Sequence, residues 1–158
     1  MRTTLALLTL TVVLASACSG SSSTGPKQGP TYDSIAGTYS GPVSGLTQGI
    51  SLSAVATVTI TQSNAALGGS YGLSGTITDG ITVVNIAGSG TISGTIASGN
   101  NPSVNVTVTG VCPGFQAQFS GAYDTANARL TLTGPIQIFY NDCSGVFLTY
   151  QETIIITR

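Results

Sequence analysis

The sequence has no histidine, no tryptophan and very little charge. Charged side chains make up 6% of its 158 residues, with four Lys and Arg against five Asp and Glu. Without histidine, the chain lacks the side chain used most often for general acid–base catalysis and for metal binding. Without a basic cluster, it lacks the electrostatic footprint of a nucleic-acid-binding protein. The composition therefore predicts a non-catalytic protein with no cofactor, no metal site and no nucleic-acid partner.

Two short motifs resemble functional patterns, but their context favours a structural interpretation. Residues 68–72 fit the pattern Gly-x-Ser-x-Gly, yet they lead into a predicted strand and no histidine is present to act as base. Asn141-Asp142 offers one carboxylate beside an amide, which is too few ligands for calcium. We interpret the first motif as coincidental and the second as a turn.

Long apolar runs are also absent, apart from one segment near the N-terminus. Residues 5–14 are mostly apolar, but this run is shorter than the roughly 20 residues that a transmembrane helix needs. Residues 14–18, Leu-Ala-Ser-Ala-Cys, follow it and resemble the bacterial lipobox. The resemblance implies that a signal peptide (residues 1–17) is removed and that Cys18 is lipidated, with palmitate among its acyl groups. It departs from the lipobox pattern at Ala15, where leucine is commonest.

The lipobox resemblance implies a cellular location. We expect a protein of the bacterial cell envelope whose membrane partner is reached through a lipid anchor. Ser19 resembles the pattern that permits transfer to an outer membrane, where the cell has one. The alternative is a secreted, unanchored protein, because Ala15-Ser16-Ala17 also fits the site of ordinary signal peptidase.

The cysteine count agrees with the lipid anchor. The chain has three cysteines, and an odd number in an exported protein needs an explanation. If Cys18 carries lipid, Cys112 and Cys143 remain as a pair suited to an oxidising compartment. We predict a disulfide between them; the alternative is two unpaired buried thiols.

After the signal, the composition divides the chain into a tether and one domain. Residues 18–34 are rich in Gly, Ser and Pro and predict a flexible tether. From residue 35 onward, apolar and polar residues alternate with period two, as in half-buried strands, and no helical period appears. We predict strands at 35–41, 51–62, 67–78, 81–97, 103–110, 115–123, 128–140 and 146–157, the fourth of which could be two strands.

Turn signals separate these strands and predict their connections. Asp79-Gly80 predicts a tight hairpin, and Gly134-Pro135 predicts a bend or bulge. Eight sequential antiparallel strands favour an all-β, up-and-down barrel, with a β-sandwich as the alternative. In the barrel, Cys112 and Cys143 lie in connections at the same end, as their pairing requires, and both chain termini lie at the opposite end.

A family resemblance points in the same direction. Gly37-Thr38-Tyr39 on the first strand, followed by eight strands and Arg158, resembles the calycin group of lipocalin and avidin-like barrels. That group has tryptophan where this chain has Tyr39, and it often packs a basic side chain from the last strand across that ring. The resemblance implies a barrel that binds a small apolar ligand. The alternative is a structural or interaction module of the envelope with a filled core.

One charged residue breaks the apolar pattern of the last strand. Glu152 shares a face with Leu148, Tyr150, Ile154 and Ile156. If this face points inward, Glu152 is a buried carboxylate that needs a partner. We therefore name Glu152 and Tyr150 as candidate ligand-binding residues, with a position at the barrel rim as the alternative for Glu152.

Overall fold

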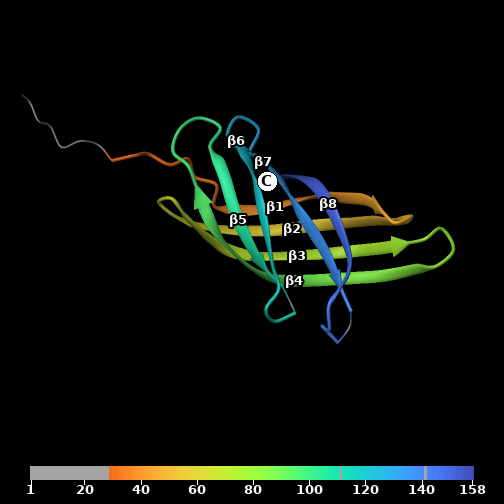
Figure 1. Cartoon of the computed structure of the whole chain (residues 1–158). Coiled ribbons are helices and arrows are strands. Elements are labelled where there is room, and N and C mark those ends of the chain that lie inside the picture. The colour runs from red at the N-terminus through yellow and green to blue at the C-terminus, as the bar shows by residue number, and fades with distance from the viewer. Residues whose placement is uncertain (1–28, 111, 141) are drawn as a thin grey trace, which may run out of the picture.

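The computed structural model describes residues 29–110, 112–140 and 142–158. Eight antiparallel strands form one closed barrel in which each strand is followed by its neighbour, with β8 beside β1 (Figure 1). The strands are β1 (Gly37–Thr47), β2 (Ile50–Ser63), β3 (Ala66–Thr78), β4 (Val83–Ile96), β5 (Ser103–Thr109), β6 (Gln116–Asp124), β7 (Arg129–Phe139) and β8 (Val146–Thr157). The described residues contain no helix that is long and apolar enough to cross a membrane.

The predicted fold is confirmed as an up-and-down barrel, and the β-sandwich alternative is wrong. The strand boundaries agree closely with the period-two pattern, except that β1 continues to Thr47 instead of ending at Gly41. Pro42 lies within this extension. Within the described strands, β1 pairs with β8 at Ser40 only, so Pro42 lies in a stretch that pairs with β2 alone. A strand with one free edge accepts a proline.

Two local features predicted from turn residues, one hairpin connection and one bulge, differ from the structure. Asp79-Gly80 is part of a four-residue loop, because the Asp79 carboxylate accepts hydrogen bonds from the backbone N–H groups of Ile81 and Thr82 at 2.9 and 2.7 Å. Gly134-Pro135 contains no bulge with β8, since the register of β7 and β8 is continuous until Ile138. Instead, the pairing of β7 with β6 ends one residue before Gly134, at Thr133. The fourth strand is a single strand despite its glycines.

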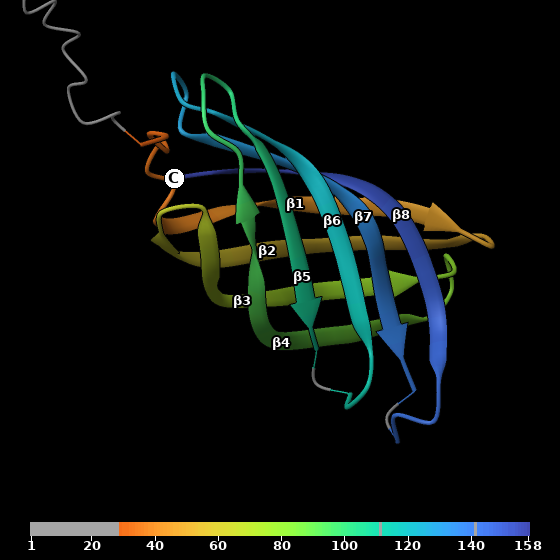
Figure 2. The ribbon, with the colours of Figure 1, turned by 60° about the vertical axis from the view of Figure 1, so that its left-hand side comes forward.

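The barrel consists of two halves that cross steeply. Figure 2 shows β1–β4 running across the view while β5–β8 run down it, so the halves meet at the β4–β5 and β8–β1 corners. Glycine makes both corners possible. A Cβ atom at Gly41 would collide with the carbonyl oxygen of Ile155, and one at Gly90 would collide with that of Thr109. The glycines within the strands therefore allow neighbouring backbones to approach closely, as expected for a coiled, closing sheet.

The end of the barrel where β1 begins and β8 ends is filled and closed by hydrogen bonds. Ile35 and Tyr39 are completely buried, and the Tyr39 hydroxyl donates to the Ile35 carbonyl at 2.8 Å. The Gln62 side chain accepts from the Ile35 N–H and donates to the Asp33 carbonyl. Tyr32 packs against the same core. The last residues of the predicted tether thus lie against the barrel.

Burial and bonding at this end predict a loss of stability at alkaline pH. Burial raises the pKa of Tyr39 to about 12 from an ordinary value of 10.0, and contact with Tyr123 acts in the same direction, while Arg158 opposes it. The unfolded chain therefore releases this proton near pH 10, before the folded protein does. The stabilisation is fully present below pH 10 and is lost as the pH rises toward 12. Its size is about 3 kcal/mol, because the pKa rises from 10.0 to about 12 and each pKa unit is worth about 1.36 kcal/mol.

We expect urea denaturation at pH 8 to 12 to show this fall, and Tyr39→Phe to reduce its slope. The variant also loses the hydrogen bond to Ile35, which costs about 1 kcal/mol at every pH. Tyr140→Phe is the control, because Tyr140 is half exposed. Burial also raises the pKa of Tyr71 and of Tyr150, so part of the slope remains in every variant. Equal slopes in wild type and Tyr39→Phe would contradict the assignment.

Candidate functional site

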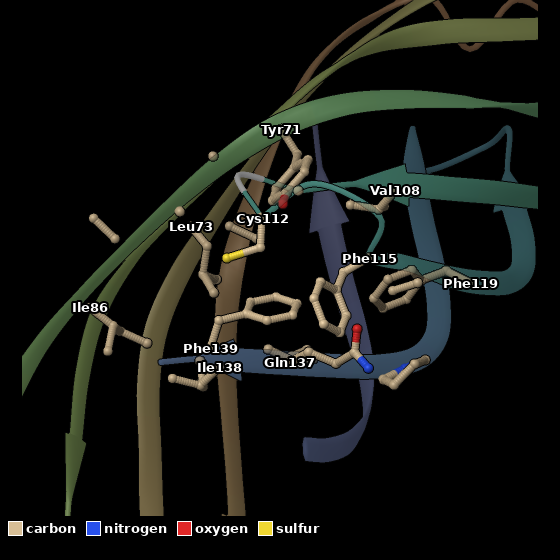
Figure 3. A pocket seen from close by; sticks show the side chains of 18 of the residues that line it. Tyr71, Leu73, Ile86, Val108, Cys112, Phe115, Phe119, Gln137, Ile138 and Phe139 are labelled. Carbon is tan, nitrogen blue, oxygen red and sulfur yellow. The ribbon is translucent and has the colours of Figure 1, made fainter. Parts of the chain in front are cut away.

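A large cavity lies between the two halves of the barrel, toward the end that carries the disulfide (Figure 3). Its volume is about 680 Å³, within the range of roughly 300–1,000 Å³ that is typical of small-molecule sites. Side chains from β2 to β8 line it. Its apolar wall includes Val58, Leu73, Ile77, Ile86, Val108, Phe115, Phe119, Leu132, Ile138, Phe139 and Ile154.

The cavity exists because backbone pairing ends before the strands do. The ladder of β4 and β5 ends at the pair Thr91 and Thr109, so the β4 residues from Val83 to Gly90 extend beyond it. The ladder of β6 and β7 ends at Ser120 and Thr133. Past these points the strands diverge, and their inward side chains no longer meet across the barrel. The filled and the hollow parts therefore belong to the same barrel.

A disulfide and the Phe115–Phe139 pair connect the diverging β6 and β7 ends, and the Tyr140–Phe147 pair closes the adjacent β7–β8 connection. Cys112, after β5, is bonded to Cys143, after β7, with their Cα atoms 5.4 Å apart. The Phe115 and Phe139 rings lie edge to face, 4.8 Å between centroids, and the Tyr140 and Phe147 rings do so at 5.3 Å. The predicted disulfide is confirmed, and the alternative of two free thiols is wrong.

Among the residues that the structure describes, no charged side chain lines the cavity. Its polar side chains are neutral and come from Tyr71, Asn85, Gln116, Gln137 and Tyr140. Burial raises the pKa of Tyr71, so its hydroxyl stays protonated and can donate as well as accept a hydrogen bond. No group of three or more His, Cys, Asp and Glu that could hold a metal gathers among the described residues. The wall is suited to bind an apolar molecule.

The structure places the two sequence-predicted ligand residues elsewhere. Tyr150 is buried, and its hydroxyl lies 3.4 Å from the Ile50 carbonyl oxygen. Glu152 is half buried on the predicted inward phase, with its carboxylate over Gly45 of β1. A Cβ at Gly45 would collide with this carboxylate. Both side chains therefore lie beside β1 at the β8–β1 corner, and neither lines the cavity. A ligand-binding role for them stays a prediction.

The residues that line the cavity were only partly visible in the sequence. The alternation of β3 placed Tyr71 and Leu73 on the inward face, but it could not show which inward residues pack and which border a space. Among the small inward residues, Ala56 and Ala117 line the cavity. Gly69, Gly75 and Gly121 instead face neighbouring backbone with no room for a Cβ. Gln137 had no signal, because it occupies the outward phase of β7.

Several other sequence features can also be located. Ser70 is an exposed residue within β3, as the structural interpretation of its motif predicts. The Asp142 carboxylate accepts a hydrogen bond from the Ser144 N–H at 3.0 Å, which forms a turn; Asn141 lies outside the described residues. The Arg158 guanidinium carbon lies 5.5 Å from the centroid of the Tyr39 ring, and the same group donates to the Ala36 carbonyl. This is the contact that the calycin resemblance implied.

Comparison with known proteins gives no relative for this chain. No family model, no curated protein and no solved structure matches it. The geometry of the cavity is therefore the basis for any statement about function.

Removing the disulfide should lower the free energy of unfolding. Cys112 and Cys143 are separated by 31 residues, so the loop-entropy model predicts a loss of roughly 3–4 kcal/mol. We expect the double variant Cys112→Ser/Cys143→Ser to show this loss in urea denaturation. Adding a reducing agent should destabilise the wild type equally and leave the double variant unchanged. A loss below about 1 kcal/mol would show that the aromatic pairs alone hold the two connections together.

Proposed function

We propose that the barrel binds a small, largely apolar molecule in the cavity between its two halves. The single observation that carries this proposal is an apolar cavity of about 680 Å³ in a protein of this size. Small eight-stranded barrels either fill their interior with side chains or hold one ligand. Here the end where β1 begins and β8 ends is filled, and the disulfide end is hollow. Because no acidic or basic side chain of the described residues lines the hollow, we propose binding rather than catalysis.

The energetic argument rests on side chains that the fold leaves partly exposed. Tyr71, Leu73, Ile86, Val108 and Ile138 are only half buried, although they face the interior. A ligand that covers them removes apolar surface from water, worth about 25 cal/mol for each Å². Phe147 and Tyr140, which border the cavity, are 44% and 51% exposed. The cavity is therefore accessible from solvent at their end of the barrel.

We also propose that the protein is a lipoprotein of the bacterial cell envelope, anchored through Cys18. The support is the lipobox resemblance, since Cys18 lies outside the described residues. The confirmed Cys112–Cys143 disulfide is compatible with export to an oxidising compartment. Residues 29–36 approach the barrel at the end where Arg158 lies. An anchor that precedes them would hold this end toward the membrane and let the cavity face away.

A second candidate is a non-catalytic interaction module. The observation that favours it is a set of exposed apolar side chains at the tips of the β1–β2 and β3–β4 hairpins. Leu46 is 70% exposed, Ile81 93% and Val83 66%. Exposed apolar groups that gather in one region often mark contact surfaces. This alternative predicts that binding of a protein partner survives when the cavity is filled.

Filling the cavity tests the main proposal. Gly88 lies on the inward phase of β4 and lines the cavity, and no atom lies within 4 Å of a Cβ built there. Gly88→Trp should therefore occupy the cavity without displacing its neighbours. We expect the affinity for Nile red, a neutral apolar dye, to fall about tenfold or more, measured by fluorescence titration. The unfolding midpoint in urea should stay the same or rise.

Ser89→Trp is the matched control, because Ser89 is the next residue of β4 and is exposed on the opposite face. Its dye affinity should equal that of the wild type. Equal dye affinity in all three proteins would show that the dye binds outside the cavity, and the proposal would fail. Native mass spectrometry of wild-type protein purified from its host should identify any molecule that remains bound.

The proposed anchor has its own test. Cells that express the wild type are grown with labelled palmitate, and the protein should carry the label and sediment with membranes. Cys18→Ser should lose the label and appear in the soluble fraction. The variant Cys112→Ser/Cys143→Ser keeps Cys18 and serves as the control for loss of a cysteine. Equal labelling of wild type and Cys18→Ser would remove the anchor from the proposal.

A further inference from the structure

The polar groups of the cavity reveal a chemical preference. The described chain contains seven charged residues, Asp33, Asp79, Asp124, Arg129, Asp142, Glu152 and Arg158, and none of them lines the cavity. Three of these carboxylates are already held by local hydrogen bonds. Those of Asp79, Asp124 and Asp142 accept from nearby backbone N–H groups in their own turns. A charged ligand group would find no opposite charge on the wall.

Burial of an unpaired charge is costly, whereas a neutral polar group needs only a hydrogen-bond partner. The wall offers such partners on opposite sides. Tyr71 comes from β3, in one half of the barrel, and Gln137 comes from β7, in the other. Figure 3 shows the Gln137 amide beside Phe115 and Tyr71 across the cavity from it. A hydroxyl and an amide can each donate and accept.

Gln137 reaches the cavity because of the way β6 and β7 separate. Its neighbours Ile136 and Ile138 occupy the inward phase, so Gln137 belongs to the outer face of the strand. The pairing of β7 with β6 ends at Thr133, and beyond it the space between the strands admits the half-buried Gln137 side chain. A polar residue of the outer face therefore borders an apolar interior.

We propose that the cavity selects uncharged amphipathic molecules, each an apolar body with a neutral hydrogen-bonding group such as a hydroxyl or ester, and that Gln137 binds this group. This inference rests on the proposed binding function and narrows it to a ligand class. Fatty-acid anions and cationic amphiphiles of equal length are discriminated against. The discrimination arises from the lack of charge on the wall.

Three probes with the same chain and different heads test the class: 1-dodecanol, dodecanoate and dodecyltrimethylammonium. Each competes with Nile red for the full-length purified protein at pH 8 and physiological salt, below its micellar concentration. We expect dodecanol to bind at least about tenfold more tightly than either ion, because the ions lose hydration without gaining a partner. A smaller ratio to either ion overturns the inference. The cation tests whether the protein's net charge of −1 explains the selectivity. Net charge alone would favour dodecyltrimethylammonium over dodecanoate, whereas an uncharged wall disfavours both ions.

A charge placed on the wall should invert the preference. In Gln137→Lys the dodecanoate affinity should rise by about fivefold or more, since the ammonium supplies the missing partner. Gln151→Lys is the control, because Gln151 is exposed on β8, does not line the cavity and gives the same net charge. An equal rise in both variants, or no rise in Gln137→Lys, overturns the role of Gln137.

The outcomes separate this inference from the binding function on which it rests. If Nile red fails to bind, or binds equally to Gly88→Trp, the binding function itself is wrong. If Nile red binds in the cavity and dodecanol and the ions compete equally, binding stands and the neutral class is wrong.

Discussion

The pairing of β4 with β5 ends at Thr91 and Thr109, and much of the remaining structure depends on this point. From this pair to the pair of Ile96 and Val104, backbone hydrogen bonds hold the two halves of the barrel together and the interior is packed. In the other direction, β4 residues Val83 to Gly90 run without β5, the walls part and the cavity opens. The disulfide and the Phe115–Phe139 contact lie on the hollow side, where backbone pairing no longer holds β6 to β7. Covalent and aromatic contacts there replace the missing ladder.

The two ends of the barrel therefore differ in structural role: one closes the barrel and the other contains the cavity. Tyr39, Ile35 and Arg158 connect the start of β1, the segment before it and the end of β8. These contacts close the barrel where β1 and β8 pair at a single position, Ser40 with Thr157. A rigid, filled end keeps the hollow end in shape without requiring side chains to fill it. A cavity of this kind is preformed, which reduces the ordering cost of binding.

The sequence predicted the strands well because alternation is a local property that survives in the fold. In β2, Leu52, Ala54, Ala56, Val58 and Ile60 are all buried, as their phase predicts. The disulfide was predictable because the parity of the connections places both cysteines at one end. The cavity was not predictable, since it depends on where ladders end, and Gly90 and Gly110 beside the last pair of β4 and β5 do not differ in sequence from the many other glycines of the strands. Glu152 was a reasonable candidate by phase, but the corner with β1 decides what its carboxylate contacts.

The order of the strands along the chain has a consequence for folding. Each pair from β1–β2 to β7–β8 joins neighbours in sequence, so these contacts form across short loops at low entropic cost. The closing contact is different, because Arg158 and Ala36 are 122 residues apart. The hairpins of this meander can therefore form one after another along the chain. Until β8 forms, one edge of β1 has no partner strand. During that interval the edge of β1 is open to strands of other molecules, and the speed of closure decides between a monomeric barrel and an aggregate.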